Sequence, residues 1–233
     1  STRLAALIAG EVHMTALPED LKGQAERAGF KVLRGKVAGP RAFLNIACCF
    51  IKDPKDLNSG WLYPESPLLA LRVRKALNHA INRADLNKAF FANKGETMVN
   101  FHLHSTRPGW NPDWEKNFQA EYGYDVNKAK QLLQEAGYGP SKPLKTTLHV
   151  QSLPNVPGSA DIIESVAQFW RAAGVEPTLS QTDSTELAAR QRAVALQNDF
   201  LISGTSSGEL IGTNAYFSSI LPRGGGMEDP IGD

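Results

Sequence analysis

Hydrophobic and polar positions along the chain follow two repeating patterns. Between residues 73 and 81 the apolar side chains recur every three or four positions, which places them on one face of a helix. Other stretches are short runs of β-branched, aromatic and aliphatic residues, which are typical of buried strands. The expected helices are 3–9, 18–28, 73–81, 84–93, 126–136, 159–173 and 185–196; the expected strands are 12–17, 30–37, 42–50, 144–150, 175–181 and 200–203.

The order of these elements predicts an α/β domain. From residue 144 to residue 203 strands and helices alternate, which suits a sheet with right-handed crossover connections. Glycines that follow the helices and capping side chains such as Asp125 and Asp183 mark the helix ends. Residues 96–118 contain prolines and two tryptophans. We predict an ordered loop there, because large aromatic side chains need a surface to pack on.

Composition and charge narrow the choice of function. The chain is 42% hydrophobic and 21% charged, which is ordinary for a globular protein. Its 25 Lys and Arg residues against 24 Asp and Glu give a formal charge of +1, so no basic surface for nucleic acid or anionic lipid is expected. The apolar run at 4–9 is too short to cross a bilayer. No leader pattern opens the chain and its last residues are rich in turn formers, so we expect part of a longer protein.

The two cysteines, Cys48 and Cys49, are adjacent in an expected strand. Neighbouring strand residues point to opposite faces, so a disulfide between them would be strained. We expect two small buried apolar side chains instead. The sequence has no CxxC pattern and no Cys/His spacing for a metal, and its cysteines therefore do not indicate a compartment.

The sequence lacks the short motifs by which common catalytic sites are recognised. GxSxG, HExxH, GxGxxG and the phosphate-binding loop pattern are all absent. Ser206 and Ser207 have no identifiable base, and Glu209 close by suits binding as well as chemistry. We therefore expect that the chain is not an enzyme and carries no cofactor.

Three segments resemble, in the same order, the motifs of one protein family. They are RLAALIAGEVHM at 3–14, VRKALNHAINRADL at 73–86 and YDVNKAKQLLQEAGY at 124–138. The chain is similar in these segments to the extracellular solute-binding proteins of the dipeptide and oligopeptide ABC importers, family 5. Residue by residue, the motifs consist of helix caps and core faces, and Arg72 and Arg74 are expected to be solvated or ion-paired. The motifs therefore indicate scaffold and not the ligand site.

The resemblance implies a fold and a division of the chain. The fold would be α/β, a periplasmic-binding-protein-like lobe (type II, class C) with a mixed sheet flanked by helices. The lobe would be incomplete, because members of the family are considerably longer. Residues 1–42 would be the end of lobe 1 and the approach to a hinge, and residues 43–233 would be lobe 2, truncated at its C-terminal end.

The same resemblance implies the substrate-binding component of an ABC importer. It would bind a small polar solute (a peptide, an opine or an oligosaccharide) in the cleft between two lobes and deliver it to a membrane permease. Such a receptor would be a monomer in the periplasm or on the extracellular face, lipid-anchored in the full-length protein. The alternative is the ligand-sensing domain of a cytoplasmic transcription regulator of similar fold, which an upstream helix-turn-helix would reveal.

The expected ligand contacts come from three loops. In the family, a strand like 200–203 is followed by a glycine, a tryptophan and an aspartate that pairs with the α-ammonium of peptides. Here Thr205 and Gly208 stand at the last two positions. A loop of hydroxyls and glycines suits hydrogen bonds to a polar solute, and is also plain turn composition. His102 and His104 lack a third metal ligand, so no metal site is expected. The contacts would be Thr205, Ser206, Ser207, Glu209 and Asn214, with His102, His104 and Trp110 from a second loop and Asn155 from a third.

Overall fold

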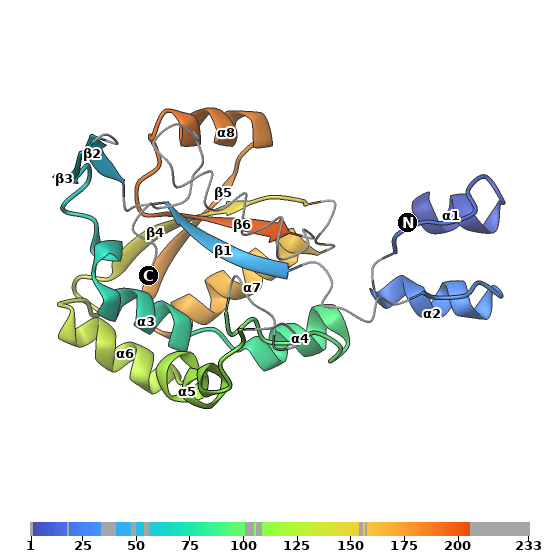
Figure 1. Cartoon of the computed structure of the whole chain (residues 1–233), viewed down its shortest axis with the longest axis horizontal. Coiled ribbons are helices and arrows are strands. Elements are labelled where there is room, and N and C mark those ends of the chain that lie inside the picture. Colours follow the sequence, from blue (N-terminus) through green and yellow to red (C-terminus); the bar gives the residue numbers. More distant parts are fainter. Residues whose placement is uncertain are drawn as a thin grey trace.

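Figure 1 shows the chain as a computed structural model. The structure describes residues 2–17, 19–33, 41–47, 50–53, 56–100, 105, 109–153, 156 and 158–205. In chain order the elements are α1 (Thr2–Ile8), α2 (Glu19–Arg27), β1 (Arg41–Ala47), β2 (Ile51–Asp53), β3 (Asp56–Trp61), a 3-10 turn η1 (Pro67–Leu69), α3 (Leu71–His79), α4 (Arg83–Phe91), α5 (Asp113–Tyr122), α6 (Val126–Glu135), β4 (Leu144–Val150), α7 (Ser159–Ala172), β5 (Val175–Gln181), α8 (Ser184–Arg192) and β6 (Asp199–Thr205).

The centre of the molecule is a mixed sheet with strand order β1-β6-β4-β5. β4 runs parallel to both β5 and β6, whereas β1 is antiparallel to β6. Helices α3 and α7 lie on one side of this sheet and α8 lies on the other, as Figure 1 shows. The α/β class and the mixed sheet flanked by helices are thus confirmed.

The larger core fills the face of the sheet that α7, α3 and α6 cover. Trp170 of α7 is its largest fully buried side chain. The indole Nε1 of Trp170 donates to the carbonyl of Leu77 in α3 (3.1 Å), and its ring meets Phe200 of β6 edge-on, with centroids 4.7 Å apart. A smaller cluster on the opposite face consists of Ala47, Leu187, Leu196 and Leu201. Both faces of the sheet are therefore covered, as a sheet with parallel strands requires.

β5 lies at one edge of the described sheet and contains Pro177. Proline cannot donate to a ladder and is confined to such edges. The carbonyl of Pro177 accepts a hydrogen bond from Arg171 Nη2 of α7 (3.3 Å). Within a strand the nitrogen and carbonyl of one residue point to the same side, so both backbone groups of Pro177 face away from β4.

The predicted strand 12–17 and the first half of the predicted strand 30–37 are wrong, because their first residues close the preceding helices. The N–H groups of Glu11 and Val12 return to the carbonyl of Ala6 in α1 (2.9 and 3.4 Å). Phe30 N–H returns to Ala25 of α2 (3.0 Å). These are the bonds of a helix C-cap, in which the residue after the glycine is often apolar. Residues 12–17 and 30–33 accordingly form no strand; 34–37 and Cys48–Cys49 lie outside the described residues.

Several elements were not expected. α5 occupies part of the predicted 96–118 loop, β2 and β3 form a short antiparallel hairpin, and η1 precedes α3. α8 also ends four residues before the predicted end at residue 196. Its closing residue is Val194, which has φ = 53°. A valine in this left-handed conformation gives no sequence cue for the end of a helix, because the position normally favours glycine.

The helices α1 and α2 stand apart from the sheet in Figure 1. Large apolar side chains of this region are exposed, among them Ile8 (56%), Met14 (81%) and Leu33 (71%). Leu4, Leu7 and Ala25 are its buried apolar residues. In the part of the chain that the structure describes, no helix has the length and apolar character needed to cross a membrane.

Candidate functional site

The carboxyl ends of the parallel strands define one edge of the sheet. β4 ends at Val150, β5 at Gln181 and β6 at Thr205. In open α/β sheets ligands bind outside such an edge, in the loops that leave it. Two of these connections, 151–158 and 182–183, lie largely or wholly within the described residues, and the chain beyond 205 lies outside them. We call this the carboxyl edge.

The loop after β4 is folded back on the start of α7. Ser159, the first residue of α7, donates from its hydroxyl to the carbonyl of Gln151 (2.7 Å) and accepts the N–H of Leu153 (2.8 Å). Gly158 precedes it with φ = 78°, which allows the sharp entry into the helix. Because both functions of the Ser159 hydroxyl are used, this buried side chain positions the loop.

The connection after β5 leads directly into α8. Asp183 Oδ1 accepts the N–H groups of Thr185 (2.8 Å) and Glu186 (3.3 Å) at the start of that helix. These backbone hydrogen bonds hold the pKa of Asp183 below its ordinary value, because they stabilise the ionised carboxylate. Asp183 is therefore a helix cap that also places one negative charge at the carboxyl edge.

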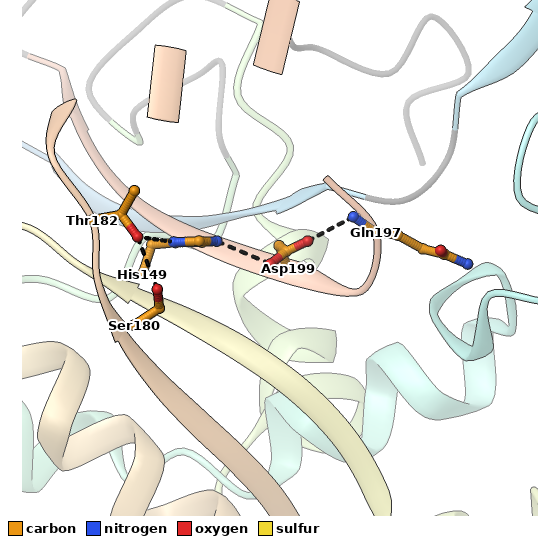
Figure 2. A network of polar contacts seen from close by, with 5 residues as sticks. All are labelled: His149, Ser180, Thr182, Gln197 and Asp199. Atoms are coloured by element: carbon orange, nitrogen blue, oxygen red, sulfur yellow. Dashed lines mark hydrogen bonds and ion pairs between the residues drawn. The ribbon is translucent and has the colours of Figure 1, made fainter. Parts of the chain in front are cut away.

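A buried polar network runs across the sheet from this edge (Figure 2). His149 of β4 lies at its centre and is 0% exposed. Its Nδ1 is 2.9 Å from Thr182 Oγ1, and its Nε2 is 2.9 Å from Asp199 Oδ1. The hydroxyls of Thr182 and Ser180 are 2.8 Å apart, and Asp199 Oδ2 accepts the backbone N–H of Gln197 (2.6 Å). Side chains from β4, β5, the loop after β5 and β6 are thus joined in one chain of hydrogen bonds.

The network continues into the connection between α8 and β6. The Gln197 side chain donates to Glu65 Oε1, and Asn198 Oδ1 accepts the hydroxyl of Ser66 (2.6 Å). Tyr63 donates to the carbonyl of Val194 (2.5 Å). Val194 and Asn198 both have positive φ, at 53° and 57°. These bonds hold a connection whose backbone is strained at the valine.

The structure describes two of the predicted ligand contacts. Thr205 is the last residue of β6, so its backbone lies at the carboxyl edge. Trp110 precedes α5 and meets Trp114 edge-to-face, with centroids 5.1 Å apart and ring planes at 88°. The remaining predicted contacts lie outside the described residues and stay predictions: Ser206, Ser207, Glu209, Asn214, His102, His104 and Asn155. No group of three His, Cys, Asp or Glu side chains in the described part could hold a metal ion.

The polar network was missed by sequence reasoning. Its only local cue is His149, a polar residue inside the apolar end of β4. The partners of His149 lie 33 and 50 positions away along the chain, at Thr182 and Asp199. They meet His149 because β4 pairs with both β5 and β6.

The residues of the 73–86 motif act as scaffold, as expected. Arg83 donates from Nη1 to the carbonyls of Asn78 (3.2 Å) and Tyr122 (3.1 Å), and from Nη2 to Asn78 Oδ1 (2.7 Å). Burial lowers the pKa of this guanidinium. Its Cζ lies 5.3 Å from the centroid of the Phe118 ring. Arg83 thus ties together the ends of α3 and α5.

The two arginines before it are also structural. Arg72 forms an exposed ion pair with Glu135 of α6 (3.5 Å), as expected. Arg74 is half-buried and donates to the carbonyls of Leu68 (2.9 Å) and Leu69 (3.1 Å), the last two residues of η1. The motif therefore holds α3 against its neighbours.

The fold is that of periplasmic binding proteins, as solved structures show. The murein tripeptide binding protein MppA of Escherichia coli superposes with a TM-score of 0.62 at 19% identity, over 90% of this chain and 37% of that one. HbpA2 of Haemophilus parasuis gives a TM-score of 0.60 at 22% identity, over 89% and 37%. AgaA of A. tumefaciens R10, solved with agropinic acid, gives 0.58 at 20% identity, over 89% and 37%.

Sequence comparison defines the family. Residues 1–227 match the sequence model of the bacterial extracellular solute-binding proteins, family 5, middle part, and the chain belongs to that family. The dipeptide-binding protein of Escherichia coli K12 is 30% identical over 123 residues, which are 52% of this chain and 22% of that protein. The chain thus spans well under half the length of these relatives.

Proposed function

We propose that this chain forms part of the substrate-binding component of an ABC importer, and that its carboxyl edge faces the solute. Membership of family 5 and the match to binding-protein folds support this function. This location is supported by the shared direction of β4, β5 and β6, which brings the carboxyl ends of all three strands to one edge.

The solute would be small and polar. Relatives are described as binding a dipeptide, a murein tripeptide or agropinic acid, so peptides and opines are the first candidates and oligosaccharides the next. Among the described residues, the hydroxyls of Ser180 and Thr182 are half-buried near this edge. In the sequence, Thr205, Ser206 and Ser207 follow at the end of β6 and beyond it. Glu209, Asn214, Asn155, His102, His104 and Trp110 remain proposed contacts from the neighbouring loops.

The wider setting follows from the same family. Residues 43–233 would form the solute-binding lobe and residues 1–42 the end of the other lobe with the approach to the hinge. The loaded receptor, as a monomer in the periplasm or on the extracellular face, would deliver the solute to a membrane permease. The family's extracellular character favours this reading over a cytoplasmic sensor domain.

A thermal-shift screen of the natural full-length protein tests the function. Dipeptides, tripeptides, opines and oligosaccharides are added singly, and we expect at least one class to raise the melting temperature. A ligand at one hundred times its dissociation constant stabilises the folded state by about 2.7 kcal/mol. If no member of the four classes raises the melting temperature at millimolar concentration, the proposed function is wrong.

A further inference from the structure

In the hydrogen-bond chain next to the carboxyl edge, the carboxylate of Asp199 determines which group donates and which accepts at each step. An ionised carboxylate can only accept hydrogen bonds. Asp199 Oδ2 accepts the N–H of Gln197 (2.6 Å), and Oδ1 therefore accepts from Nε2 of His149 (2.9 Å). A neutral imidazole has one ring proton. In a neutral His149 this hydrogen bond places that proton on Nε2, and Nδ1 bears none.

The direction continues through the two hydroxyls. The bare Nδ1 of His149 accepts the proton of Thr182, whose Oγ1 is 2.9 Å away. A hydroxyl has one proton, so Thr182 can only accept from Ser180, 2.8 Å away. Ser180 therefore donates its hydroxyl proton to Thr182. Toward a solute, the Ser180 oxygen can then act only as a hydrogen-bond acceptor. Ser180 is the last but one residue of β5, next to the carboxyl edge, and its side chain is half-buried.

We propose that Ser180 is a specificity-determining residue of the solute site, at which the solute places an N–H or O–H donor and not a carboxylate. The proposal rests on the proposed function. Thr182, His149 and Asp199, which Figure 2 shows joined to Ser180 in one chain of contacts, are positioning residues that hold the Ser180 hydroxyl in the accepting direction. The carboxylate of Asp183, which follows directly along the chain, adds to the exclusion of an anionic group.

The protonation of His149 tests the direction without any ligand. The full-length protein is labelled with 15N-histidine, and the His149 ring signals are assigned by their loss in His149→Gln. We expect a protonated Nε2 and a bare Nδ1. A proton on Nδ1, in the other tautomer or in the imidazolium, would make Thr182 the donor to Ser180 and turn the Ser180 proton outward. That result overturns the proposal and leaves the proposed function untouched.

Binding of L-alanyl-L-alanine tests the contact itself. This dipeptide has two donors, the ammonium and the amide N–H, and each is removed in turn by using the desamino analogue and the N-methyl amide analogue. We expect Ser180→Ala to weaken dialanine binding about tenfold, the loss typical of one hydrogen bond to a good donor. For the analogue that lacks the donor to Ser180, Ser180→Ala should not change the affinity, because that hydrogen bond is already missing.

Controls separate the contact from a general effect. Ser165→Ala removes another half-buried hydroxyl, which donates to the carbonyl of Asp161 within α7, and should leave binding unchanged.

Thr182→Val tests the positioning role and should weaken dialanine binding. The double variant with Ser180→Ala should bind no more weakly than Ser180→Ala alone; additive losses would contradict the positioning role. If Ser180→Ala weakens the binding of dialanine and of both analogues by the same factor, or weakens none of them, the proposal is overturned and the proposed function is not. If the wild type binds none of them, the peptide form of the proposed function fails and the proposal fails with it.

Discussion

Among single residues, Arg83 offers the sharpest test of the scaffold. Its guanidinium donates hydrogen bonds to three oxygen atoms, and the single ammonium of a lysine could not make all three. We expect Arg83→Lys to lower the free energy of unfolding by about 1–2 kcal/mol, measured by urea denaturation. Arg72→Lys is the matched control, because its ion pair with Glu135 is exposed and should contribute close to nothing. Equal losses in the two variants would show that the hydrogen bonds of Arg83 between α3 and α5 do not stabilise the fold.

Asp183 gives a prediction about pH. Hydrogen bonds from the N–H groups of Thr185 and Glu186 lower its pKa in the folded state. A carboxyl with a lowered pKa stabilises the fold above its unfolded pKa, about 3.9, and loses that contribution as the pH falls through the folded value. Asp183→Asn should therefore be less stable than the wild type near pH 6, and the difference should shrink below about pH 4. Chemical denaturation across this range measures it; a difference that does not change with pH would be inconsistent with the cap.

At the scale of elements, one side chain holds α7 against α3 and β6. Trp170→Phe leaves a small cavity and deprives the Leu77 carbonyl of its donor. We expect a loss of about 2–3 kcal/mol in the free energy of unfolding. Trp114→Phe, the same change at a half-buried tryptophan, should cost under about 1 kcal/mol. If the two variants lose the same amount, the contact between the helices does not depend on Trp170.

Local sequence was a good guide where an element carries its own signal. The predicted bounds of β4 and β5 match the structure, because Pro143 and Gly174 stand directly before these strands and polar loop residues follow them. α5 was missed, since prolines precede it and its apolar side chains, Trp114, Phe118 and Tyr122, are only half-buried. The polar network could not be predicted from residues alone. The contacts of His149 depend on strand pairing and register, which short-range patterns do not encode.

For the molecule as a whole, the structure separates the N-terminal helices from the rest. α1 and α2 bury apolar residues between them and stand apart from the sheet (Figure 1). Deleting residues 1–33 should therefore change the free energy of unfolding of the remaining chain by less than about 0.5 kcal/mol. Circular dichroism during denaturation measures this.

A second deletion provides the contrast. Removal of 184–192 takes away α8 and uncovers Leu196 and Leu201 on the second face of the sheet, and this variant should lose its cooperative transition. If removal of the N-terminal helices is as damaging as removal of α8, the two parts of the chain do not fold independently. The expected division of the chain near residues 42 and 43 would then be wrong.

Pro177 has a consequence for how copies of this molecule meet one another. A sheet edge with a full row of free donors and acceptors can template a strand from another chain, which is how fibrils and swapped assemblies grow. At Pro177 the donor is missing, and the acceptor is already occupied by Arg171. An incoming strand would find a gap in the middle of β5 and would have to displace a guanidinium to pair there. This local backbone detail thus disfavours pairing between copies of the molecule along the β5 edge of the described sheet.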